Sequence, residues 1–552
     1  MFPKRPLSSD SSSDACYTAA SKWLTKCLEE HECPNRLSPL PTRLIHVGDA
    51  ETPPHLHISH GEKGSWATLS HCWGSHQTLT TETHTMASHC EGLELSALPE
   101  TFRDAVLITR KLGCRYLWID SLCILQDSAK DWEAESNKMA DIYQNALFNI
   151  AAEESLDDST GIFRSVREKR KPVEYLALPC HSSKRYVEGV LLIKISTSWP
   201  PIMNLNRKSS PPSPLSSRGW VLQENILSAR KLLYKRDNLY WECGASQFYE
   251  TFPTSTRPSY PRVCYSIHHI SSSNNTLDYN FKWWYMHVND YTNRQLTFDK
   301  DRIPAIRGLV NAFSERTGYR YLNGIWLEDA VQALAWRNSG HSVDFNQGPS
   351  WSWTSLVPKP AKEPIYNRDF VPSHLDRIYG PKNQRALLVD HSMERLESGW
   401  RDGDGCTRIS LKAWCQDISG ASHDSFPHHH LLQDNSNPSC IRVDGAQADL
   451  DSSLDWATNS TLTLDTESAC FPNGQNLIRL RLFDWVFFDG GENRIDAMGT
   501  TVLILKPFQQ LNGSMVYRRL DLKDMFVQYV SAWEKYPWPP LDSWDQRVIT
   551  LV

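Results

Sequence analysis

Residues 115–152 read "RYLWIDSLCILQDSAKDWEAESNKMADIYQNALFNIAA", and this stretch decides the fold class of the chain. It opens with a short apolar run, continues through a segment of helical periodicity and closes on a second apolar run. Both runs are apolar enough to be buried on two faces, as the strands of a parallel sheet are. A strand, a helix and a second strand in this order predict a βαβ unit with a right-handed crossover.

The same alternation extends on both sides of this stretch. Upstream, residues 65–74 ("SWATLSHCWG") predict a buried strand that ends in a glycine turn. Residues 98–113 predict a helix, because Pro stands near their start and Gly at their end. Downstream, residues 217–243 predict a helix and two short strands joined at "KRDN". We therefore expect an α/β fold with a mostly parallel sheet flanked by helices.

Length and composition set expectations for the rest of the chain. With 552 residues, two or three domains are expected, and the net charge of −6 gives no basic surface for a nucleic-acid partner. Late strand-like runs separated by Gly, Asn, Asp and Pro predict a mainly β C-terminal region. The predicted parts are a disordered N-terminus (1–20), a helical flank (21–63), the α/β domain (64–243), a helical or mixed connecting region (244–345) and the mainly β region (346–552).

The N-terminal residues and the distribution of cysteines indicate the cellular compartment of the protein. The first residues carry basic side chains but no apolar core of a secretory signal, and no run reaches the length of a membrane span. The 14 cysteines are scattered, often within apolar strands, as expected in a reducing compartment. We predict a cytoplasmic protein with no membrane span.

Cys27, His31 and Cys33 have the chemistry of metal ligands and lie within a short helix predicted in residues 21–37. The spacing C-x3-H-x-C supplies three ligands and no fourth is obvious nearby, whereas structural zinc sites nearly always have four. We therefore favour packing of this helix on the next domain over a metal site, and we predict no metal.

Glu135 stands in the apolar stripe of a helix predicted at 129–145. A period of 3.6 residues places it with Trp132, Met139 and Ile142, and the opposite face is polar. An unpaired buried carboxylate is costly, so Glu135 needs a partner, a raised pKa or an opening to a cavity. Two interpretations stay open, a functional carboxylate and an ion pair with a buried arginine. The arginines considered for such a pair are Arg103, Arg110, Arg115 and Arg218.

Polar residues follow two of the predicted strands, and open α/β sheets bind ligands outside the carboxyl ends of strands. One strand ends at Asp120, and another ends at Ser70, shortly before Trp73. If the strands are parallel neighbours, their ends form one rim. The plainer alternatives are a turn cap for Asp120, core packing for Trp73 and strand-end hydrogen bonding for Ser70. The candidate ligand-binding residues are Ser70, Trp73, Gln126, Arg218 and Glu224.

These motifs, taken in order, resemble the fungal heterokaryon incompatibility (HET) domain. The resemblance runs from "WATLSHCWG" through the stretch quoted above to "RGWVLQENILSARKLLYKRDNLYWEC", over about residues 65–243. One departure is His71, where the family usually has Tyr. The resemblance implies a role in non-self recognition and programmed cell death after hyphal fusion. Such a protein acts as a death-signalling module, through self-association or a protein partner.

The HET family is in turn remotely similar to TIR and flavodoxin-like domains, and some TIR domains cleave NAD with a glutamate. That similarity implies an alternative, an NAD glycohydrolase with Glu135 and Asp120 as candidate catalytic carboxylates. NAD would then be a substrate, and no cofactor is predicted. The sequence has no G-x-G-x-x-G, no P-loop and no G-x-S-x-G elbow. An enzyme requires Glu135 to open to a pocket, whereas a signalling module requires only that it be paired.

Overall fold

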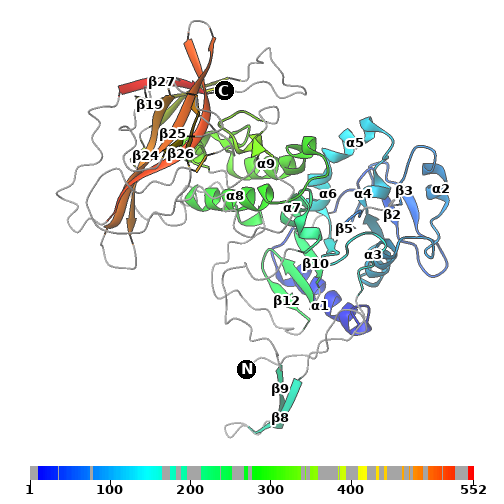
Figure 1. Cartoon of the computed structure of the whole chain (residues 1–552). Coiled ribbons are helices and arrows are strands. Elements are labelled where there is room, and N and C mark those ends of the chain that lie inside the picture. The colour runs from blue at the N-terminus through cyan, green and yellow to red at the C-terminus, as the bar shows by residue number, and fades with distance from the viewer. Residues whose placement is uncertain are drawn as a thin grey trace. The chain divides into compact units, whose positions relative to one another are not determined.

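The computed structural model describes much of the N-terminal half of the chain and a set of strands near the C-terminus (Figure 1). Two compact units are present, the first comprising Met1–Ile270, Arg294–Thr297 and Asp301–Phe313, and the second the remainder. The described residues are 10–34, 37–74, 79–163, 175–181, 188–194, 213–235, 238–250, 267–270, 277–336, 342–343, 348–357 and the strands between 383 and 551.

An eight-stranded mixed sheet forms the centre of the first unit, in the order β12-β11-β10-β7-β5-β6-β2-β3. The four central strands, β10, β7, β5 and β6, run parallel to one another. The strands are β2 (Arg43–His46), β3 (His55–Ile58), β5 (Trp66–Ser70), β6 (Tyr116–Trp118), β7 (Phe148–Ala151), β10 (Arg230–Tyr234), β11 (Leu239–Cys243) and β12 (Gln247–Tyr249). Two small pairs accompany them, β1 (Ser38–Pro39) with β4 (Lys63–Gly64), and β8 (Tyr175–His181) with β9 (Glu188–Lys194).

The expectation of a mostly parallel sheet is wrong at the edges. Three of the strand pairings are parallel, and the four pairings toward the two edges are antiparallel. The physical reason lies in the connections. A parallel crossover needs a dozen or more residues, whereas β10, β11 and β12 follow one another through short turns that only an antiparallel pair can use.

Helix α3 shows the predicted boundaries and the predicted buried face. It runs from Glu100 to Lys111, directly after Pro99, and the chain leaves it at Gly113 with a φ of +75°. A positive φ at this point favours glycine, which ends the helix. The residues predicted to face inward are all buried, namely Phe102, Ala105, Val106, Thr109 and Leu112. The other helices of this unit are α1 (Asp14–Glu30), α2 (Met86–Glu91), α4 (Asp120–Cys123), α5 (Ala129–Ser136), α6 (Met139–Asn145) and α7 (Val221–Leu227).

Two helices differ from the prediction in their limits. Helix α1 begins at Asp14, so residues 14–20 are helical rather than part of a disordered N-terminus. The single helix predicted at 129–145 is interrupted, because α5 ends at Ser136 and α6 begins at Met139. The predicted polar face is nevertheless exposed, at Lys130, Glu133, Asn137 and Asp141.

Large aromatic side chains fill the core around the central strands. Trp118 of β6 has no exposed surface, and the ring of Tyr143 meets it edge-on at 5.7 Å. The indole nitrogen of Trp66 donates a 3.1 Å hydrogen bond to the carbonyl of Ile142. These contacts hold α6 on the sheet and thereby fix the side chains that α6 carries.

The second unit contains helices and a separate sheet. Every described residue between Asn383 and Leu551 lies in a strand. Its sheet comprises β17 (Asn383–Gln384), β18 (Ala386–Ser392), β19 (Arg408–Ile418), β22 (Thr463–Leu464), β24 (Leu477–Phe488), β25 (Ile495–Leu511), β26 (Ser514–Gln528) and β27 (Asp545–Leu551). Shorter strands are β13 (Tyr321–Leu322), β14 (Ile325–Trp326), β15 (Ser342–Val343), β16 (Leu356–Val357), β20 (Leu431–Gln433), β21 (Cys440–Val443) and β23 (Phe471–Pro472). The remaining α-helices in the described part of the chain are α8 (Leu277–Thr292), α9 (Pro304–Thr317) and α10 (Ala330–Ala333). Among the described helices, none is both long and apolar enough to cross a membrane.

Candidate functional site

The carboxyl ends of β5 and β7 meet at the point where the strand order reverses. The chain goes from β5 to β6 on one side of β5 and then returns to β7 on its other side. Open α/β sheets bind ligands at such a switch point. Ser70 is the last residue of β5 and pairs with Ala151 of β7, so it marks this position.

Glu224 reaches the switch point from helix α7. The hydroxyl of Ser70 donates a 2.5 Å hydrogen bond to Glu224 Oε2, and Asn149 Nδ2 donates to the same hydroxyl at 3.0 Å. Burial raises the pKa of Glu224 to about 7, although Ser70 and the charge of Arg218 oppose the shift. A carboxyl group that titrates near neutral pH is suited to accept or donate a proton.

Tyr143 and Asn149 complete the buried polar group, and sequence reasoning missed both. Tyr143 donates from its hydroxyl to the carbonyl of Leu69 at 3.2 Å, and burial raises its pKa. Asn149 also accepts a 3.0 Å hydrogen bond from Thr68. The signal for Asn149 was present, because it is a polar residue inside the otherwise apolar run "LFNIAA". A buried amide in a central strand needs hydrogen-bond partners, and its neighbours supply them.

Asp120 connects the end of β6 to the residues that follow β5. Its Oδ2 accepts a 2.9 Å hydrogen bond from the indole nitrogen of Trp73, and its Oδ1 lies 3.8 Å from His71 Nδ1. Burial lowers the pKa of His71 to about 4 despite the nearby Asp120, so the ring is neutral at pH 7. The guanidinium of Arg218 donates to the main-chain carbonyl of His71. Arg218 is therefore held against the segment that links Ser70 to Trp73.

Five of the sequence-predicted residues thus lie around the switch point, and Gln126 stands beside them. Its side-chain amide donates to the carbonyls of Asp120 and Ile124 at 3.1 and 3.2 Å. Gln126 therefore braces the short helix α4, which begins at Asp120. The five residues that lie around the switch point are Ser70, Trp73, Asp120, Arg218 and Glu224.

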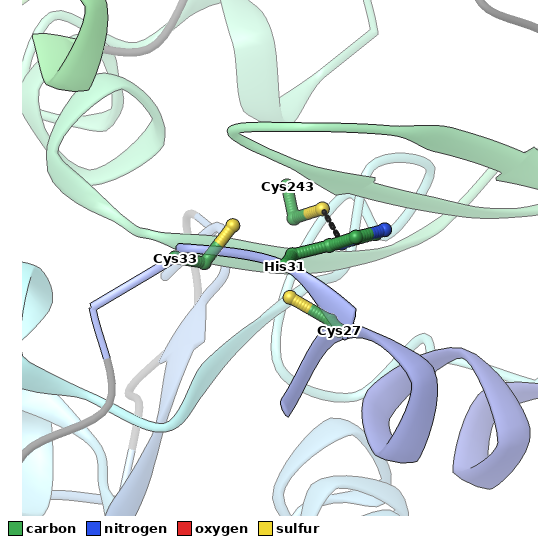
Figure 2. Close-up of side chains that lie close together, drawn as sticks. All are labelled: Cys27, His31, Cys33 and Cys243. Atoms are coloured by element: carbon green, nitrogen blue, oxygen red, sulfur yellow. Dashed lines mark hydrogen bonds between the residues drawn. The ribbon is translucent and has the colours of Figure 1, made fainter. Parts of the chain in front are cut away.

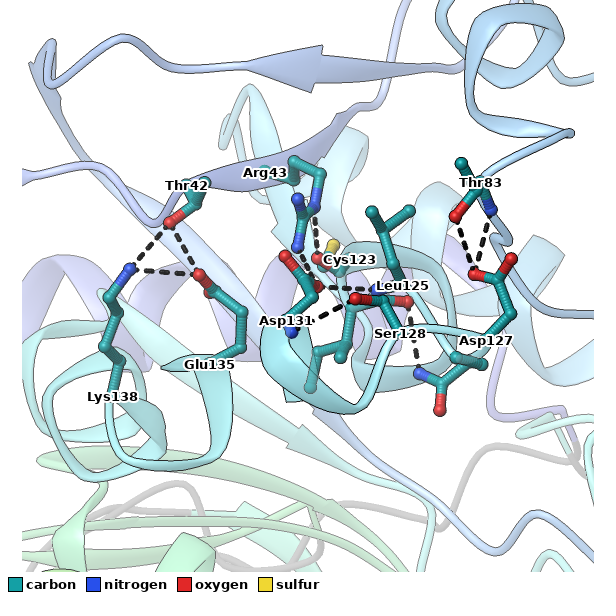
Figure 3. Close-up of polar contacts among 12 residues, drawn as sticks. Thr42, Arg43, Thr83, Cys123, Leu125, Asp127, Ser128, Asp131, Glu135 and Lys138 are labelled. Carbon is teal, nitrogen blue, oxygen red and sulfur yellow. Dashed lines mark hydrogen bonds and ion pairs between the residues drawn. The ribbon is translucent and has the colours of Figure 1, made fainter. Parts of the chain in front are cut away.

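The hydrogen bonds of Glu135 lead elsewhere, to the residue that precedes β2 (Figure 3). Glu135 Oε1 accepts from Thr42 Oγ1 at 2.8 Å and from Lys138 Nζ at 3.0 Å. The Glu135 side chain is 2% exposed and that of Lys138 is 51% exposed. Its cationic partner is therefore a lysine at the surface, and none of the arginines considered from the sequence.

The buried arginine ion pair of helix α5 belongs instead to Asp131 (Figure 3). Arg43 of β2 donates to Asp131 Oδ2 at 2.5 Å and to the carbonyl of Cys123 at 2.8 Å. The same carboxylate oxygen accepts from the backbone amide of Leu125 at 2.8 Å. Asp131 thus fastens α5 to β2, one turn of the helix before Glu135.

Comparison with known protein families gives one match inside the first unit. The family model described as heterokaryon incompatibility protein (HET) matches residues 66–224. Residues 66–224 are a HET domain. The match begins at the first residue of β5 and ends at Glu224, so both partners of the Ser70–Glu224 hydrogen bond lie within it. Comparisons with curated proteins and with solved structures find no match for the chain.

In the HET domain, several buried or half-buried polar side chains lie at the carboxyl ends of the parallel strands. Two carboxyl groups differ in their surroundings there. Glu224 is buried and its pKa is raised, whereas Asp120 is half-buried and accepts hydrogen bonds from Trp73 and from the backbone amide of Ser121. Two carboxyl groups in different environments are the arrangement by which acid and base roles are divided in enzymes.

Proposed function

We propose that this chain is a HET-domain effector of fungal non-self recognition and that its HET domain triggers growth arrest or cell death. The observation that carries the proposal is the family match over residues 66–224. The signal would pass through self-association or through a protein partner, and we place the action in the cytoplasm. As a death-signalling module, the protein requires an intact sheet but no turnover of a small molecule.

Induced expression of the full chain in a fungal host tests this proposal. We expect the wild-type chain to reduce the number of viable cells, and we expect Trp118→Ala, which opens a cavity in the core of the domain, to reduce this effect. Protein levels measured by immunoblot separate loss of function from loss of protein. Unchanged viability at high levels of the wild-type chain would contradict the proposal.

A second candidate function is hydrolysis of the nicotinamide–ribose bond of NAD, which fits a TIR-like domain. It is favoured by the position of Asp120 and Glu224 at the switch point of the sheet. The four parallel strands follow the chain order 2-1-3-4, which is that of flavodoxin-like sheets. A carboxylate there would stabilise the oxocarbenium-like transition state, and water would add to the ribose carbon as nicotinamide leaves.

Release of nicotinamide from NAD by the purified chain tests this second function. Glu224→Gln and Glu135→Gln form a matched pair, because each keeps side-chain volume and removes one carboxyl group. Loss of nicotinamide release in Glu224→Gln alone would assign the chemistry to the switch point, and loss in Glu135→Gln alone would assign it to the residue suggested by the TIR resemblance. If no protein releases nicotinamide while cell killing persists in both variants, the chain acts by signalling only.

A further inference from the structure

Three cysteines and one histidine converge at the edge of the sheet, outside the HET-domain match (Figure 2). They are Cys27, His31, Cys33 and Cys243, and their ligand atoms all lie within 4.8 Å of one another. The three cysteines are free, so no disulfide accounts for their proximity. A tetrahedral zinc ion with bonds of about 2.0–2.3 Å holds its ligand atoms roughly 3.5–3.8 Å apart. The limit of 4.8 Å leaves only small side-chain movements to reach this geometry, and His31 Nδ1 already lies 3.3 Å from Cys243 Sγ.

Local structure explains how residues so distant in the sequence meet. Cys27 is fully buried in the last turn of α1, which ends at Glu30. His31 then takes an extended conformation, with φ −113° and ψ 146°, and the chain turns Cys33 back toward the helix. Cys243 is the last residue of β11 and begins the tight turn into β12. Cys243 is the fourth residue of the cluster, which the spacing of Cys27, His31 and Cys33 in the sequence did not predict.

The orientation of His31 suits a ligand. Its Nδ1 lies 3.3 Å from Cys243 Sγ and therefore faces the cluster, while its Nε2 lies 3.4 Å from the hydroxyl of Ser246. When Nε2 carries the proton and donates it to Ser246, Nδ1 has a free lone pair for a metal ion. Ligating histidines usually have such a partner on the other ring nitrogen, since it fixes the tautomer and the direction of the ring.

Arg230 supplies the charge that such a site requires. Three thiolates outweigh the two positive charges of a zinc ion, so the loaded site carries a net negative charge. The Arg230 side chain is 1% exposed, and its Nε donates to Cys27 Sγ at 3.2 Å. It also donates to the carbonyls of Pro34 and Cys33, at 2.8 and 3.3 Å. A buried guanidinium that contacts a ligand sulfur and the backbone of the ligand loop is a balancing countercharge.

We propose that Cys27, His31, Cys33 and Cys243 bind one zinc ion in a closed structural site. Thiolate sulfur with one imidazole nitrogen is the ligand set that zinc prefers, and four protein ligands leave no position for substrate. The ion joins the C-terminal end of α1 to the β11–β12 turn. It acts together with the stacked pair Trp23 and Phe248, whose ring centroids are 6.1 Å apart. The site therefore stabilises the N-terminal helix against the sheet edge.

The metal content of the full chain tests the proposal directly. The protein is purified without chelators from cells supplied with zinc, and zinc is measured by mass spectrometry against protein concentration. We expect about one zinc per chain in the wild type and a large loss in Cys243→Ser and Cys33→Ser. Cys90→Ser is the matched control, because Cys90 is a half-buried cysteine of α2 outside the cluster, and it should keep its zinc. His31→Cys should retain zinc with four sulfur ligands, whereas His31→Ala should not.

Cobalt and thiol measurements keep the test decisive if a variant fails to fold. Replacement of the metal by Co²⁺ in the wild-type chain should give visible ligand-field bands of a tetrahedral ion and a thiolate-to-cobalt charge-transfer band. A mercurial reagent that titrates the thiols should release the zinc. A folded wild-type chain that takes up neither zinc nor cobalt would overturn the proposal. So would a disulfide between two of the three cysteines in protein freshly purified from reducing cells.

Discussion

Ser70 and Glu224 are 154 residues apart in the sequence, and their side chains share a 2.5 Å hydrogen bond. Ser70 ends the central strand β5, and Glu224 lies in the last helix that the HET-domain match reaches. The bond therefore joins the two ends of the matched segment at the switch point of the sheet. Because it involves a buried carboxyl group with a raised pKa, the protonation of Glu224 is coupled to the stability of the domain.

Glu224→Gln should change how stability depends on pH. The pKa of Glu224 is about 7 in the folded protein, against an ordinary value of 4.5 for a glutamate. The folded state therefore binds the proton more tightly, and this group makes the unfolding free energy fall as pH rises from about 4.5 to 7. Gln does not titrate, so the variant should gain about 3 kcal/mol relative to the wild type across this window. Urea unfolding at both ends of the window measures the gain, and a constant difference between the two proteins would contradict it.

His71→Tyr should change the pH dependence of the unfolding free energy in the opposite direction. Burial lowers the pKa of His71 from 6.5 to about 4, so the folded protein resists protonation. The contribution of His71 is fully present above pH 6.5 and is lost as pH falls toward 4. The variant, which carries the aromatic residue usual in the family, should gain about 3 kcal/mol of stability relative to the wild type as pH falls from 6.5 to 4. In the wild type the two slopes offset each other between about pH 4.5 and 6.5. The double variant with Glu224→Gln should therefore show neither slope.

Trp118→Ala should be strongly destabilising. Trp118 has no exposed surface and packs in the central strands, so truncation leaves a large cavity and should cost about 3–5 kcal/mol of unfolding free energy. The half-buried Trp132 offers a matched control, and Trp132→Ala should cost less. The urea midpoints of the two variants give the comparison. Equal midpoints for Trp118→Ala and the wild type would mean that β6 is not central to the fold.

The two carboxylates of helix α5 should differ in their effect on stability (Figure 3). Asp131→Asn leaves Arg43, whose side chain is 8% exposed, without its charge partner and should cost about 3–5 kcal/mol. Glu135→Gln keeps the hydrogen bond from Thr42 and removes an ion pair whose lysine is half exposed, so it should cost less stability than Asp131→Asn. Urea unfolding of both variants under the same conditions tests the order. A larger cost for Glu135→Gln would mean that the pair with Lys138 is the stronger one.

The strands and helices around β5 were predictable because their signals are local. Pro99 and Gly113 bound α3, and apolar runs of strand length mark β5, β6 and β7. The antiparallel edges were not predicted, since the direction of a strand depends on the length of its connection and not on its own composition. The interruption between α5 and α6 was also missed, because the apolar period continues across it.

The candidate site was predictable only in part. Strand ends pointed to Ser70 and Asp120, which do lie around the switch point. Glu135 was chosen because it lies on an apolar helix face. Periodicity predicts that such a residue is buried, but it does not predict which residue forms a hydrogen bond with it. The partners are Lys138, three residues away, and Thr42, 93 residues away in the sequence. Cys243 was overlooked as a metal ligand because the spacing of residues in the sequence identifies only ligands that lie close together along the chain.

The contact between His31 and Cys243 has a consequence for synthesis of the chain, because 212 residues separate them. At about 5–20 residues per second, a ribosome needs on the order of 10–40 s to make that interval. During this time α1 has left the ribosome without its docking surface, and its apolar residues Trp23 and Leu24 are exposed. Helix α1 therefore waits for its contacts with β11 and β12 until these strands have been made. It is the segment of the nascent chain on which we expect chaperones to act first.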